Sequence, residues 1–398
     1  MSGIWEDQDD KTIQIDLSLS DRTKKLGKEP LISGAEYNQR LREKYASIYQ
    51  TSWTTTESQN SNLSKLFSTS KSILSDKSYS LQSTHLEIEQ LQSANTNNYS
   101  KSVITTTEFQ GNLLLIAGKD KRLKIFEVPG ETGENLKTSV CFKDLPITNA
   151  RFCSEKVYVS GERPYFYIYD LAKEISQRVP CIGKYTGQPL GKMKISPDSR
   201  YAVFLGNNGR MFQISTQSQK LVHEFKMNSP CKDLCFIDDN IVACGGDEGD
   251  VYIWDLGMRD CVNRFSDEGT IKITCMDAKD NFLAIGSNTG VVNVYDRKSE
   301  GFEGTNPKPI KAVMNLTTSV EGLCFNHNAE MLAMFSKWKK DAVKILHMQS
   351  LTVFANWPSF RDHVKYPMAC DFNATSELLT VGNDEGAALL YRLNHYTQ

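Results

Sequence analysis

Short apolar runs rich in β-branched and aromatic residues alternate with glycine, asparagine and aspartate between residues 103 and 393. Runs of this kind, bounded by turn-forming residues, predict β-strands joined by tight turns. The clearest example is 245–255, where a Gly-Gly-Asp-Glu-Gly turn leads into an alternating strand that ends at Trp254 and Asp255. The hydrophobic pattern therefore predicts a sheet-rich domain over most of the chain.

This turn-and-strand unit recurs along the chain. The strand-ending position that corresponds to Trp254 falls at residues 126, 169, 214, 254, 295, 346 and 391, at spacings of 43, 45, 40, 41, 51 and 45. A period of roughly 40–45 residues with four strands per unit is typical of WD-repeat propeller blades. One blade cannot bury both of its faces, whereas a ring of blades buries them against each other. We therefore predict an all-β fold: a seven-bladed WD40 β-propeller with an extended, partly helical N-terminal arm.

The end of the chain indicates how this ring would close. The last predicted strand ends near Leu393, which leaves the seventh blade without an outer strand. That strand should come from upstream of Val103, where Leu86, Ile88 and Leu91 are spaced suitably. We accordingly place the propeller at residues 85–398.

The predicted blades depart from the usual WD pattern. Trp254-Asp255 is a literal Trp-Asp pair, and no Gly-His dipeptide precedes any core strand. The usual buried Asp-His-Ser/Thr-Trp network of a WD blade therefore cannot form completely. We expect ring packing to depend mainly on apolar burial, at about 25 cal/mol per Å², with a smaller contribution from specific bonds.

The region before the propeller has a different character. Of the 34 residues in 51–84, 21 are Ser, Thr, Asn or Gln, too polar to offset the entropy of ordering, so we predict a flexible linker there. Residues 1–50 form a predicted binding arm. In it, Trp5 stands among acidic residues, and Ile13, Ile15 and Leu17 alternate as in a strand that could add to a partner's sheet edge. The alternative is a disordered acidic tail.

A short amphipathic helix is predicted from residue 35 to residue 48 of the arm. Tyr37, Leu41, Tyr45 and Ile48 fall on one face of it. A helix this short is marginal alone and should dock on something. Its own propeller and a partner's groove are both open alternatives.

Charge balance limits the classes of partner. The 398 residues include 46 Lys plus Arg and 48 Asp plus Glu, a net charge of −2, which argues against binding nucleic acid with the whole surface. A local patch is still expected at Lys337, Trp338, Lys339 and Lys340, in a turn of blade six, because a tryptophan between lysines suits base stacking and phosphate contact. A solvated basic loop or a protein contact is the alternative.

The sequence lacks the common motifs of catalytic sites, metal sites and membrane spans. The ten cysteines contain no Cys-x-x-Cys pair, the six histidines are dispersed, and no phosphate-binding loop or nucleophile elbow occurs. We therefore expect no catalytic residue, no cofactor, no metal site and no small-molecule substrate, so the chain should not be an enzyme. The sequence has no apolar run of about 18 residues, the length that a membrane span requires. The acidic N-terminus lacks the pattern of a signal peptide, so we expect an intracellular protein.

Several stretches outside the generic blade pattern are similar to a known family. The chain resembles the WD-repeat family of U3 small nucleolar RNA-associated protein 18, a UtpB subunit of the small-subunit processome. The resemblance covers nearly all of the chain except the linker. It rests on Ser33-Gly34-Ala35-Glu36-Tyr37, Arg40-Leu41-Arg42, Ser102-Val103-Ile104, 143–147, 160–167, 204–207, 290–296, 315–318, 352–358 and 388–393.

The resemblance implies a non-catalytic scaffold in the nucleus and nucleolus. Its expected partners are other UtpB subunits, other processome proteins, pre-rRNA and the U3 small nucleolar RNA particle. Trp5, Tyr37, Leu41 and Tyr45 would be the arm's partner-binding residues, and the lysine-tryptophan turn a second contact to RNA or protein. The alternative is a generic WD-repeat adaptor of another nuclear complex.

Overall fold

The computed structural model describes residues 12–16, 31–48, 81–128, 135–180, 189–299, 302, 304, 306–359 and 362–397, with the side chains of the α-helix at 34–48 described as far as Tyr45. Residues 1–77 and 78–398 form two compact units, and each is taken by itself. Trp5 and most of the predicted linker lie outside the described residues.

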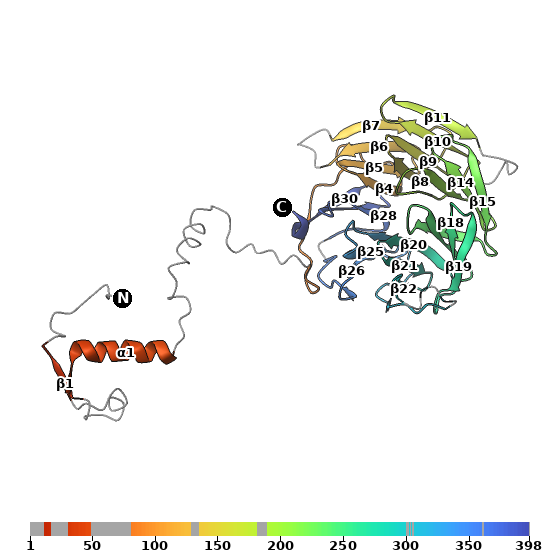
Figure 1. The fold of residues 1–398 in the computed structure, drawn as a ribbon. Helices are drawn as coiled ribbons and strands as arrows, with labels where there is room; N and C mark the ends of the chain where they lie inside the picture. Colours follow the sequence, from red (N-terminus) through yellow and green to blue (C-terminus); the bar gives the residue numbers. More distant parts are fainter. Residues whose placement is uncertain are drawn as a thin grey trace. The chain divides into compact units, whose positions relative to one another are not determined.

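Seven antiparallel sheets of four strands make up the larger unit, which confirms the predicted propeller (Figure 1). Blade one contains β4 (Ile104–Gln110), β5 (Leu113–Gly118), β6 (Arg122–Glu127) and β7 (Leu136–Cys141). Blade two contains β8 (Asn149–Cys153), β9 (Lys156–Ser160), β10 (Tyr165–Asp170) and β11 (Ile175–Pro180). Blade three contains β12 (Met193–Ile195), β13 (Tyr201–Leu205), β14 (Arg210–Ser215) and β15 (Leu221–Lys226).

The next three blades repeat this order. Blade four contains β16 (Cys231–Phe236), β17 (Ile241–Gly246), β18 (Asp250–Asp255) and β19 (Asp260–Ser266). Blade five contains β20 (Ile273–Lys279), β21 (Phe282–Ser287), β22 (Val292–Asp296) and β23 (Lys311–Val313). Blade six contains β24 (Gly322–Phe325), β25 (Met331–Phe335), β26 (Val343–His347) and β27 (Thr352–Val353). Apolar clusters of buried side chains fill the space between neighbouring blades, as expected for sheets that bury their faces against each other.

Blade seven closes the ring with a strand from the other end of the propeller. It combines β28 (Pro367–Phe372), β29 (Leu378–Asn383) and β30 (Ala388–Leu393) with β3 (Ile88–Gln90), which pairs antiparallel to β30. In Figure 1 this blade lies next to blade one, where β28 and β29 contact β4. The predicted source of the outer strand is confirmed.

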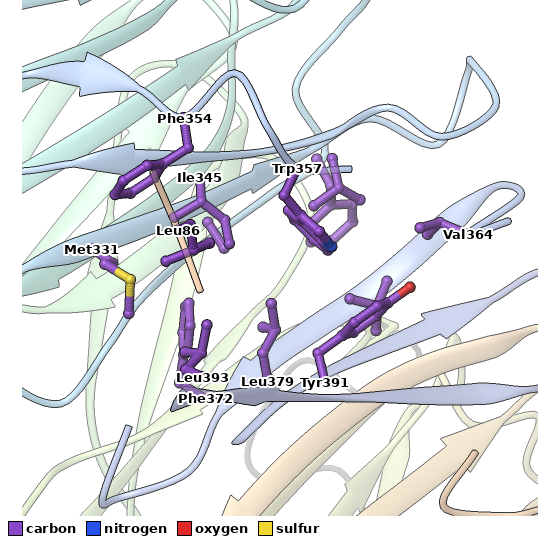
Figure 2. Close-up of a cluster of buried hydrophobic side chains, with 14 of the residues drawn as sticks. Leu86, Met331, Ile345, Phe354, Trp357, Val364, Phe372, Leu379, Tyr391 and Leu393 are labelled. Atoms are coloured by element: carbon purple, nitrogen blue, oxygen red, sulfur yellow. The ribbon is translucent and has the colours of Figure 1, made fainter. Parts of the chain in front are cut away.

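The segment before β3 is anchored in the interface between blades six and seven. Leu86 is 1% exposed, and Figure 2 shows it among Phe354, Ile345 and Leu393. The side chain of Asn356 accepts a hydrogen bond from the backbone amide of Leu86 (3.1 Å) and donates one to its carbonyl oxygen (2.7 Å). Ring closure is therefore secured by apolar burial and by the two hydrogen bonds between the Asn356 side chain and the Leu86 backbone.

Glycine turns on one side of the ring follow the predicted motifs. Gly249 and Gly290 have φ values of +79° and +91°, in the region that favours glycine. A Cβ atom at Gly290 would lie 2.5 Å from the carbonyl oxygen of Leu316. These turns therefore require glycine both for backbone conformation and for close approach of the next connection.

Carboxylates on the first strands of four blades bond the backbone of the following blade. Glu108 accepts from the amide of Phe152 (2.5 Å), and Asp371 accepts from the amide of Phe109 (2.6 Å). The same contact recurs from Asp233 to Met276 (3.0 Å) and from Asp277 to Phe325 (2.9 Å). These inter-blade bonds add to the apolar packing of the ring, and their relative contribution stays a prediction.

The smaller unit contains β1 (Gln14–Asp16), β2 (Leu31–Ser33) and α1 (Gly34–Ile48). The two strands pair antiparallel, with Ile15 opposite Ile32, and Ile32 is buried. Ser33 caps the helix, since its hydroxyl accepts from the amide of Glu36 (3.4 Å). The predicted helix is confirmed, and the predicted strand residue Ile15 pairs within the chain. None of the described helices is long and apolar enough to span a membrane.

Candidate functional site

The lysine-tryptophan turn lies between β25 and β26 of blade six, where the sequence predicts a turn. Ser336, the residue just before it, is buried, and the Ser336 hydroxyl lies 2.7 Å from that of Thr318. At its far end, the amide of Asp341 donates to the carbonyl oxygen of Lys365 (2.7 Å), in the connection that leads to blade seven. The turn is therefore held at both ends by hydrogen bonds, to Thr318 on one side and to Lys365 on the other.

Glu321 organises the tryptophan of this turn. One of its carboxylate oxygens accepts from the indole N–H of Trp338 (3.0 Å), and the other accepts from the ammonium of Lys337 (2.8 Å). The Lys337 ammonium also lies 5.1 Å from the centre of the Trp338 ring. The indole is nevertheless 63% exposed. A large aromatic surface is thus presented to solvent in a fixed orientation, which suits recognition of an apolar or planar group.

The three lysines of the turn differ in their surroundings. Lys337 is paired with Glu321, so its charge is largely offset. Lys340 lies 5.8 Å from the ring centre of Tyr366, and Lys339 is exposed. Lys339 and Lys340 are therefore better placed than Lys337 to meet a phosphate. Sequence reasoning missed Glu321, because its role depends on contact with residues 16 and 17 positions away.

The predicted arm residues lie on α1. Tyr37 is half-buried, whereas Leu41 is 39% exposed and Tyr45 is 60% exposed. These three residues follow at intervals of four and so share one face of the helix. Whether this face docks on a partner stays a prediction.

Charged side chains also gather around a small cavity of about 160 Å³ at the centre of the ring. Each cationic group there has an acidic neighbour: Lys192 with Asp233 (3.5 Å), Lys194 with Asp277 (3.8 Å) and Arg151 with Glu108 (3.4 Å). Burial raises the pKa of Glu108 to about 7, although Arg151 acts in the opposite direction. Burial likewise raises the pKa of Asp371 to about 6.

The central carboxylates have a structural use. Because Glu108 and Asp371 each accept a backbone amide from the next blade, they join blades to one another. Asp371 lies inside the mostly apolar strand β28, whereas Glu108 follows three threonines in β4, so the sequence gives no common signal for the two carboxylates. Among the described residues, no group of three or more His, Cys, Asp or Glu side chains is arranged to hold a metal ion.

Comparison with known proteins finds relatives over nearly the whole length of the chain. The chain is 35% identical to the U3 small nucleolar RNA-associated protein 18 homolog of Arabidopsis thaliana, over 98% of this chain and 76% of that protein. The chain belongs to the U3 small nucleolar RNA-associated protein 18 family. The resemblance seen in the sequence is thereby confirmed.

Other members of the U3 small nucleolar RNA-associated protein 18 family differ more. The human homolog is 32% identical over 78% of this chain, which spans 57% of that protein. The protein of Saccharomyces cerevisiae is 28% identical over 98% of this chain and 79% of its own length. No family model matches the chain. Membership in this family agrees with the WD-repeat propeller observed in the structure.

Proposed function

We propose that this chain is a non-catalytic scaffold subunit of the small-subunit processome, within its UtpB subcomplex. In this role it supports pre-rRNA processing and small-subunit biogenesis in the nucleolus, together with the U3 small nucleolar RNA particle. The observation that carries the proposal is the similarity, over 98% of the chain, to a relative named for its association with U3 small nucleolar RNA. Its partners are other UtpB subunits and processome proteins.

The proposed mechanism is multivalent binding. The exposed face of α1, with Leu41 and Tyr45, engages one surface of the assembly, and the Trp338 turn of the ring engages another. A tether between two binding modules turns the second contact into an intramolecular step, which raises avidity without a single tight contact. Lys339 and Lys340 beside the fixed indole would let the turn contact RNA as well as protein.

Affinity purification of the full-length chain from its own cells tests the proposal. RNA sequencing and mass spectrometry of the bound material should show enrichment of U3 small nucleolar RNA, pre-rRNA and processome proteins. An unrelated seven-bladed propeller with the same tag serves as the control. Recovery no higher than that control would refute the proposal, and enrichment of a different nuclear complex would favour the generic adaptor.

Point variants separate the two contacts. Replacing Leu41 and Tyr45 by aspartate should reduce recovery of protein partners, and Trp338→Ala should reduce cross-linking to RNA or to protein at the ring. Met258→Ala is the matched control, because Met258 is 80% exposed in the connection between β18 and β19. Variants of Trp5 and Tyr37 test the two remaining arm residues. Deletion of the arm must keep residues 81–398, because β3 closes the ring.

A further inference from the structure

A groove of about 510 Å³ lies between blade seven and blade one, at the place where the ring closes. It exists because the closing strand is short: β3 pairs with β30 over three residues, whereas β7 of blade one has six. After Gln90 the ladder becomes irregular: the amides of Leu91 and Ala94 still donate to the carbonyl oxygens of Leu390 (2.8 Å) and Ala388 (2.9 Å) of β30, and the chain turns over residues 94–97. These turns form one wall of the groove, and its size falls within the range of about 300–1,000 Å³ that is typical of ligand pockets.

This wall is fixed to both blades. The buried side chain of Asn95 donates to the carbonyl oxygen of Gly386 (2.7 Å) and accepts from the amide of Ala388 (3.0 Å) in blade seven. From blade one, the Lys124 ammonium donates to the carbonyl oxygens of Asn98 (2.8 Å) and Tyr99 (3.0 Å). A ligand would therefore meet a preformed groove and would not have to order the wall, which lowers the entropic cost of binding.

The floor of the groove is apolar and its rim is polar. Phe126, Val128 and Leu390 line it and are at most 5% exposed. Asparagine, glutamine, serine and threonine side chains from residues 92–98 line its rim. Amide and hydroxyl groups around an apolar floor suit the backbone and one bulky side chain of a peptide.

Arg392 gives the groove its charge preference. Among the described residues that line the groove, Arg392 alone has a charged side chain, and that side chain is half-buried. It forms no ion pair with the described residues. Arg392 and Leu390 are two residues apart on β30, so their side chains lie on the same face, about 7 Å apart along the strand. An extended peptide presents its own residues i and i+2 at the same spacing.

We propose that this groove binds a short extended peptide of a partner protein, in which a large apolar residue and an acidic residue are separated by one residue. The apolar side chain packs on Phe126 and Leu390, and the carboxylate pairs with Arg392. The inference goes beyond the scaffold role and does not depend on it, because peptide binding is a property of the isolated chain without RNA.

Selection of 12-residue peptides from a random phage-displayed library on the purified full-length chain tests the inference. We expect enrichment of peptides that carry an apolar and an acidic residue at this spacing, in either order. Synthetic fluorescein-labelled copies of them should bind at least tenfold more weakly to Arg392→Glu, which reverses the charge, and to Gln92→Trp, which fills the mouth from an exposed position. Lys344→Glu, which reverses a half-buried lysine on β26, should leave binding unchanged.

Several outcomes would overturn the proposal. One is enrichment no greater than in the starting library, and another is equal binding to the wild type and to both groove variants, each with an unaltered circular dichroism melt. A concentration-dependent dimer in sedimentation experiments that Gln92→Trp abolishes would instead make a second copy of the chain the occupant.

Discussion

Substitution of Leu86 by alanine tests how the ring closes. Leu86 is 1% exposed and packs in the interface between blades six and seven (Figure 2). Leucine-to-alanine changes in well-packed cores cost about 2–5 kcal/mol, and the cost is larger where the neighbours cannot collapse into the cavity. Here Asn356 holds the Leu86 backbone with two hydrogen bonds, so the segment cannot move inward to fill the space. We therefore expect a loss of about 3 kcal/mol or more in the free energy of unfolding.

Urea unfolding of the full-length chain measures this loss, followed by tryptophan fluorescence, to which the buried Trp357 of the same cluster contributes. The midpoint should fall while the slope stays constant, because the surface exposed on unfolding is the same. Leu41→Ala is the matched control: the same chemical change at a position that is 39% exposed should cost no more than about 0.5 kcal/mol. A loss below about 1 kcal/mol for Leu86→Ala, or equal losses for the two variants, would refute the account of closure.

Three further predictions concern the ring. Burial raises the pKa of Glu108 to about 7, above its unfolded value, so the stabilisation from this group is present below about pH 4 and is lost as the pH rises to 7. Glu108→Gln should therefore flatten the decline in the free energy of unfolding between pH 5 and pH 7.5, measured by urea titration at both pH values. An unchanged decline in the variant would contradict this prediction. Gly290→Ala should lower the free energy of unfolding by more than about 1 kcal/mol, whereas Gly269→Ala, with positive φ and no atom near the added Cβ, should cost less; equal thermal shifts would count against the close approach. Trp338→Ala should reduce cross-linking to partners but change the melting temperature little, since the indole is 63% exposed; a large thermal shift would assign it a structural role instead.

The repeat pattern predicted most of the fold because its signals are local. Alternating apolar positions and Gly-rich turns specify a strand and its ends, as in 245–255, and their recurrence implies a ring. Closure by residues near Ile88 was also predictable, since three strands at the C-terminus require a fourth from elsewhere. The helix face of Tyr37, Leu41 and Tyr45 followed from spacing alone, and its confirmed position on α1 needs no long-range contact.

The bonds between blades were not predictable in this way. An aspartate in a strand does not indicate that its carboxylate will meet the amide of Phe109, 262 residues away, and the pairing of Asn356 with Leu86 spans 270 residues. The wall at Asn95, its tie to Lys124 and the groove beside Arg392 likewise arise from where the short closing strand ends.

The sequence by itself determined the seven-fold repeat, the strands, the turns and the family, because each of these is encoded in neighbouring residues. The tertiary structure alone decided that Glu321 orients Trp338, that carboxylates join successive blades, and that a groove opens between blades seven and one. The Glu321–Trp338 contact depends on how the strands of blade six pair, whereas the bonds between blades and the groove depend on how the blades pack around the ring. In each case the residues that meet are separated along the chain, and their separation carries no local signal.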